Sequence, residues 1–139
     1  MEKSKELARR LLVILDNDTK SLHERIVERK DEYISFLSLH RSREHFKKIF
    51  RSVYHTITIE NMLLLTEELL VSVNKFYRLI EKYEWYLMHT EDQPSVVENV
   101  SNSYVKDISS QFSLLSVFLE AELNTASEPL EKFDREHGL

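Results

Sequence analysis

The six histidines are the residues of this sequence with the widest possible chemistry, because imidazole binds metals and transfers protons. None of them has a glutamate three residues earlier, which excludes the Glu-x-x-His pairs that hold two metal ions in some helical bundles. One local cluster remains, made by His40, Glu44 and His45. Side chains with this spacing are more typical of a solvated helix face, so we expect no metal site and no cofactor.

Other catalytic patterns are missing as well. The chain has no cysteine, and its one glycine, Gly138, cannot build the glycine-rich loop that holds a phosphate group. A phosphotransfer histidine at His40 or His55 has no supporting local pattern. Adjacent acidic residues such as Glu67 and Glu68 point about 100° apart on a helix, which is typical of solvated positions. We therefore expect a protein that is not an enzyme.

The composition indicates which elements position these side chains. Of the 139 residues, 42% are hydrophobic, one is glycine and two are proline. Sheets need many more turn residues, so the sequence predicts an all-α fold in a single domain. The apolar run near the N-terminus, LLVIL, is shorter than the core of a signal peptide, and no stretch reaches the roughly 18 apolar residues of a membrane span. We therefore expect a cytoplasmic protein without a membrane span.

Apolar spacing predicts a helix over residues 4–40. Most members of its seam are four or seven residues apart, namely Leu7, Leu11, Leu15, Leu22, Ile26, Tyr33 and Leu37. Asp18 occupies a skipped seam position, inside a run of poor helix formers at residues 16–19. The pattern Ser21-x-x-Glu24 is a possible capping box for a second helix, although the unbroken register favours one long helix with a weak point.

Residues 43–57 repeat the apolar pattern, and Ser42 is a candidate N-cap for a short helix there. The register is also compatible with a helix that continues from the preceding segment. Whether residues 4–57 form one, two or three helices therefore stays open.

The second half of the chain predicts two long helices. Thr58 is a typical N-cap for a helix over residues 59–90. Ser95-x-x-Glu98 has the pattern of a capping box, and it precedes a helix over residues 96–126 that we expect Pro129 to end.

These helices predict an elongated antiparallel bundle of three long helices and one short helix, similar to a four-helix bundle. Residues 1–127 are expected to form the bundle domain. Residues 128–139 are expected to form a short helical turn or a frayed tail.

Positive charge is concentrated in the first part of the chain. Residues 1–58 carry 13 Lys and Arg against nine Asp and Glu, whereas residues 59–139 carry six against 15. The simplest interpretation is that oppositely charged helices lie side by side. One segment is a possible anion-binding site, and its basic residues are Arg41, Arg43, Lys47, Lys48 and Arg51.

Two observations weigh against a nucleic-acid partner for this basic segment. Phe46 and Phe50 lie on the apolar seam, so we expect them in the core rather than against bases. The isoelectric point of the chain, about 5.7, is also low for a protein that binds phosphate backbones.

The helix over residues 59–90 has leucines around most of its circumference, which predicts burial on more than one side. Trp85 lies about 180° from Phe76 on this helix, opposite the apolar seam. Trp and Tyr are typical anchors of protein interfaces. We therefore predict a partner interface on this helix, with the residues Trp85, Tyr86, Val71, Leu64 and Met88.

Three functions are compatible with these patterns. The first is a non-enzymatic helical bundle that acts through protein–protein contact, as a homodimer or with another protein, in an adaptor, regulatory or chaperone role. The second is a ligand-sensing bundle with an aromatic-lined pocket at Phe76, Tyr77, Tyr83 and Tyr104. The third, which has the least support, is a module that binds anionic polymers through its basic helix.

Overall fold

The computed structural model describes residues 2–33, 43–90 and 94–136, and the side chains of residues 5–32, 44–89 and 100–125. All regular elements in these ranges are helical, which confirms the all-α prediction. In chain order they are α1 (Glu2–His23), the π-helical turn η1 (Glu24–Glu28), α2 (Lys30–Tyr33), α3 (Arg43–Ile49), the 3₁₀ turn η2 (Tyr54–Thr56), α4 (Ile59–Met62), α5 (Glu67–Thr90) and α6 (Pro94–Glu136).

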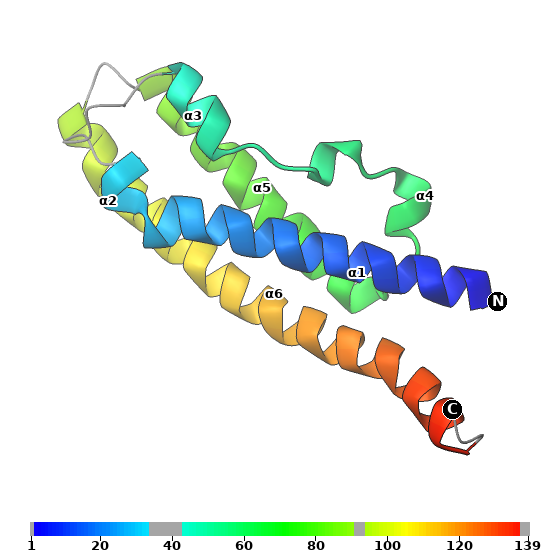
Figure 1. The fold of residues 1–139 in the computed structure, drawn as a ribbon. Coiled ribbons are helices and arrows are strands. Elements are labelled where there is room, and N and C mark those ends of the chain that lie inside the picture. Colours follow the sequence, from blue (N-terminus) through cyan, green and yellow to red (C-terminus); the bar gives the residue numbers. More distant parts are fainter. Residues whose placement is uncertain (1, 34–42, 91–93, 137–139) are drawn as a thin grey trace.

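The longest helix, α6, packs against both α1 and α5 and runs in the opposite direction to them (Figure 1). Of the short helices, α3 packs against α5 and α4 packs against α1, whereas α2 contacts η1. In the part of the chain that the structure describes, no helix is long and apolar enough to cross a bilayer.

The core lies where the apolar faces of α1, α5 and α6 meet. The predicted seam of α1 is buried from Leu11 to Ile26, whereas Leu7 is partly exposed. Fully buried side chains of the other two helices recur at intervals of three, four and seven residues, as expected for single helix faces. They are Leu69, Val73, Phe76, Tyr83 and Leu87 of α5, and Ile108, Leu115 and Leu119 of α6.

Residues 16–19, where the sequence predicts a weak point, form regular α-helix. The helix becomes irregular further along the chain, at residues 24–28. α1 continues through residues 16–19, where the Thr19 hydroxyl donates a hydrogen bond to the Asp16 carbonyl (3.2 Å). The turn η1 follows, and its last bond runs from Arg29 N to Glu24 O (2.8 Å), an interval of five residues. The pattern at Ser21-x-x-Glu24 therefore does not begin a helix.

The predicted helix over residues 59–90 is divided in two. Thr58 is the N-cap of α4, as predicted, and its hydroxyl accepts a hydrogen bond from Asn61 N (3.2 Å). The chain then turns, and the Thr66 hydroxyl accepts from Leu69 N (3.4 Å) as α5 begins. Each threonine cap satisfies one of the free N–H groups at a helix start, which lowers the cost of the break.

Two further boundaries differ from the sequence prediction. α3 ends at Ile49, so residues 50–57 do not continue it. α6 runs from Pro94 past Pro129, which therefore does not end the helix. A proline removes one N–H···O bond, and the bonds on either side of it allow a helix to continue at a cost of about 3 kcal/mol. The domain boundary at residues 127 and 128 stays a prediction.

His23 joins α1 to α6 through a ring contact. Its imidazole stacks on Phe112, with the ring centroids 4.0 Å apart and the planes at 16°. Burial lowers the pKa of His23 below 6.5, and the Glu28 carboxylate, at 3.6 Å from Nδ1, raises it by a smaller amount. The native fold therefore favours the neutral imidazole.

A pH dependence of stability follows from His23. We expect the free energy of unfolding to fall as the pH decreases through 6.5, because the unfolded chain takes up a proton at residue 23 more readily than the native chain. His23→Phe keeps an aromatic ring against Phe112 and should remove this part of the pH dependence. Urea denaturation followed by circular dichroism between about pH 7.5 and pH 5.5 measures it.

His55→Phe is the control for this experiment, because the His55 imidazole is mostly exposed. It should leave the contribution of residue 23 in place. Equal pH dependence in the wild type and in His23→Phe would contradict the prediction.

Candidate functional site

One line of exposed side chains runs along the outer side of α5. Its members are separated by four, three, four, three and four residues, and we call them the α5 stripe: Val71, Lys75, Arg78, Lys82, Trp85 and His89. This spacing keeps all six on one face of a helix. Trp85 is 63% exposed, and its ring stacks on that of His89 with the centroids 4.2 Å apart.

The structure divides the five residues of the predicted partner interface. Trp85 and Val71 belong to the α5 stripe. Tyr86 and Met88 are partly buried against the core, and the Tyr86 ring lies 5.6 Å from that of Tyr104. Leu64 also packs against the core, in the turn between α4 and α5. These three are less exposed than Trp85 and Val71, and whether they belong to one interface stays a prediction.

The four residues of the predicted aromatic pocket form two pairs of rings, and each ring also contacts an aromatic side chain outside the set. Phe76 and Tyr83 are fully buried. Tyr77 meets Phe76 edge to face at 5.3 Å, and Tyr104 stacks on Tyr83 at 5.2 Å. The rings thus fill the space between the helices, and only Tyr77 among the four lines a described hollow.

The predicted anion-binding segment is described in part. Arg41 lies outside the described residues, as does the side chain of Arg43. Lys47, Lys48 and Arg51 are exposed, whereas Phe46 and Phe50 are buried, as predicted.

Arg25 fixes the end of this segment to the turn η1, which follows α1. Its guanidinium donates hydrogen bonds to the carbonyls of Lys48 (3.2 Å), Ile49 (2.7 Å) and Arg51 (3.0 Å). These carbonyls stand at the C-terminal end of α3, where a cation is favourable.

The same segment meets an acidic part of α5. Burial raises the pKa of Glu84, and His55 and Lys47 each act to lower it. Lys47 at α3 and Glu84 on α5 therefore lie close enough to interact electrostatically.

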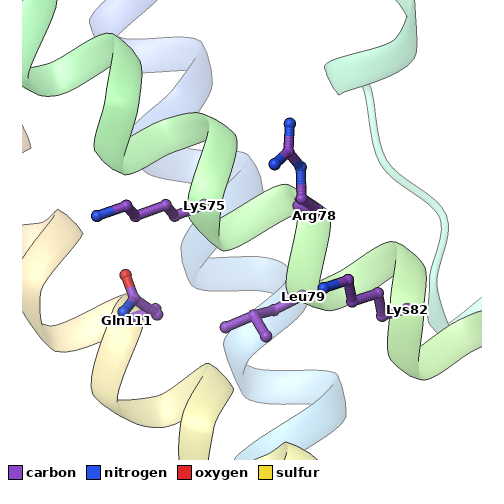
Figure 2. Close-up of a pocket in the computed structure, with 5 residues that line it drawn as sticks. All are labelled: Lys75, Arg78, Leu79, Lys82 and Gln111. Atoms are coloured by element: carbon purple, nitrogen blue, oxygen red, sulfur yellow. The ribbon is translucent and has the colours of Figure 1, made fainter.

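A second basic surface, which the apolar and charge patterns of the sequence did not predict, lies in the middle of the α5 stripe. Lys75, Arg78 and Lys82 line a hollow of about 230 Å³ between α5 and α6, together with Leu79 and Gln111. Figure 2 shows Lys75 and Leu79 extending from α5 toward α6, where Gln111 lies. The available signal was that three of the six basic residues after position 58 are spaced by three and four.

Asp18 forms a buried polar cluster in the C-terminal part of α1. Its carboxylate accepts hydrogen bonds from the hydroxyls of Tyr77 (2.6 Å) and Ser52 (2.5 Å) and from Val53 N (3.2 Å). Burial, followed by the hydrogen bond to Asp18, raises the pKa of Tyr77, so the phenol stays protonated. A charged acceptor thus joins two helices and a loop.

Tyr54 covers this cluster. Its ring stacks on that of Tyr77, with the centroids 3.9 Å apart, and its hydroxyl donates to the Asn74 side-chain oxygen (2.7 Å). A second hollow of about 230 Å³ lies beside this stack, and its lining residues are Tyr54, Asn74, Tyr77, Arg78 and Glu81.

The remaining candidate residues for catalysis or metal binding do not come together in one site in the described part of the chain. No group of three His, Asp or Glu side chains there could hold a metal ion. His40 lies outside the described residues, and Glu44 is exposed.

Comparison with models of protein families, with curated protein sequences and with solved structures found no match to this chain. Its function is therefore argued from its own surfaces. The clearest of these are the α5 stripe and the basic hollow beside it.

The Asp18 cluster predicts a large loss of stability on truncation. We expect Asp18→Ala to lower the free energy of unfolding by about 2–4 kcal/mol, because it leaves the buried Tyr77 hydroxyl without its acceptor. Tyr77→Phe should cost about 1–2 kcal/mol, since Asp18 keeps its two other donors. Urea denaturation followed by circular dichroism measures both changes.

The matched control is Asp16→Ala, two positions earlier on the same helix. Asp16 forms an ion pair with the exposed side chain of Lys20 at 2.9 Å. Its removal should cost less than about 1 kcal/mol. Similar losses in the Asp18 and Asp16 variants would show that the buried cluster does not stabilise the fold.

Proposed function

We propose that this protein is a non-enzymatic helical bundle that acts through protein–protein contact, and that the α5 stripe is its contact surface. The observation that carries the proposal is the exposure of Trp85, which is 63% accessible. A large aromatic ring on the surface has apolar area that a partner can cover, and tryptophan is the most common anchor of binding energy at interfaces.

The form of the stripe supports a protein partner. Six exposed residues on one helix face present side chains at each turn of α5, the arrangement that packs against a second helix. Val71 and Trp85 place apolar surface toward the two ends, with the cations between them. The partner is a second copy of the chain or another protein, and the role that we propose is regulatory or adaptor-like.

The same proposal includes the finer architecture. We propose that α1, α5 and α6 are the three long members of an elongated antiparallel bundle, completed by the short α3, and that the protein works in the cytoplasm. The packing of α6 against α1 and α5 supports this arrangement.

Photo-crosslinking tests the contact surface. With p-benzoylphenylalanine in place of Trp85, irradiation of cells that produce the protein should give covalent protein adducts, because this position lies in the contact. Denaturing gel electrophoresis and mass spectrometry detect them. An adduct of twice the chain mass of 16.6 kDa identifies a second copy, and any other mass identifies another protein.

Val117 is the matched control position, since it is 64% exposed and lies on α6 outside the stripe. Crosslinking there should be rare. Adducts that are absent at position 85, or equally frequent at both positions, would contradict the proposed contact surface.

A further inference from the structure

The middle of the α5 stripe carries three positive charges that form no ion pair with a carboxylate in the described part of the chain. Lys75, Arg78 and Lys82 are all exposed, and none of them forms an ion pair with another described residue. They stand in the half of the chain where acidic residues outnumber basic ones by 15 to six. The chain therefore concentrates cations here against its own overall charge.

The wall of the hollow adds a feature that suits an apolar side chain of a partner. Leu79 provides apolar surface between α5 and α6.

We infer that the α5 stripe binds an acidic α-helix of another protein, whose carboxylates pair with Lys75, Arg78 and Lys82. This inference rests on the proposed function and names the partner's chemistry. Acidic side chains spaced by three and four residues on the partner would match the three cations. An apolar side chain one turn further would cover Trp85.

Charge argues against a second copy as the occupant. A two-fold symmetric contact would bring the same patch of both copies together. It would then oppose one set of three cations with an identical set, and like charges across an interface are unfavourable. An acidic helix from another protein has no such repulsion.

Length and charge also favour a peptide over a nucleic acid. The three cations span seven residues of α5, or about 10 Å along the helix axis. That length matches two turns of a partner helix. Three cations neutralise only a few phosphates of a nucleic acid. The net charge of −5 would also repel a long polyanion from the rest of the molecule.

A labelled peptide tests the inference. The probe is a fluorescein-labelled, alanine-based helix of about 18 residues, with glutamates spaced by three and four and one leucine a turn beyond them. Its fluorescence anisotropy should report binding, and Kd should rise about tenfold between about 50 and 200 mM NaCl. The same peptide with glutamine in place of glutamate should not bind.

Two triple variants with equal charge change locate the site. Lys75→Gln, Arg78→Gln and Lys82→Gln together should weaken binding about tenfold or more. Lys47→Gln, Lys48→Gln and Arg51→Gln together remove three exposed charges near the end of α3 and should change Kd less than about twofold. Both variants should keep their helices, because all six side chains are exposed, and circular dichroism checks this.

Four results would overturn the inference. In the first two, the acidic peptide does not bind the wild type, or the two triple variants weaken its binding equally. In the other two, a single-stranded oligonucleotide of similar charge binds more tightly than the peptide, or the protein forms a dimer in solution that the first triple variant abolishes. If position 85 forms crosslinks but the first triple variant still binds the peptide normally, the acidic partner is wrong and the proposed contact surface stands. If position 85 forms no crosslinks and the peptide does not bind, both proposals are wrong.

Discussion

The buried carboxylate of Asp18 is the constraint on which the arrangement of this fold depends. A charge in the seam of α1 is tolerable only where donors surround it, and they come from Tyr77 on α5 and from Ser52 and Val53 in the loop after α3. These contacts hold α5 and the loop against the C-terminal part of α1. They also fix the rotation of α5 about its own axis, because Tyr77 must face inward.

The outer surface of α5 follows from that rotation. The residues of the α5 stripe lie on average about a third of a turn from Tyr77, so they are directed away from α1. The core fills with Phe76, Ile80 and Tyr83 on the inner side. The hydrogen bonds of the buried Asp18 thus help to place the cations of the α5 stripe and Trp85 on the outer surface of α5.

Much of the fold could be predicted because its long helices have regular buried faces. The α1 seam from Leu11 to Ile26 and the cap at Thr58 were visible as patterns of residue type. The break at Thr66 was not, because the apolar residues before it continue the helical spacing and only the threonine followed by Glu67 and Glu68 signals a new start. Neither was η1, since a π-helical turn depends on packing that local residue types do not encode.

The candidate site was predictable only in part. Helical phase placed Trp85 opposite the seam, and its exposure agrees. The same reasoning placed Leu64 on one unbroken helix with Trp85, whereas it lies in the turn between α4 and α5. The basic run around residues 41–51 is conspicuous in the sequence, whereas Lys75, Arg78 and Lys82 are separated by acidic and apolar residues and gather only when the helix forms.

The position of Trp85 gives the protein an unusual optical property. It is the one tryptophan of the chain and stands largely in water, while the buried aromatic side chains are tyrosines and phenylalanines. Indole emission from the native protein therefore originates at its surface, next to the His89 ring. That emission will change when molecules bind to α5 and will change little when the core loses its packing. Tryptophan emission is usually used in the opposite way, as a reporter of unfolding.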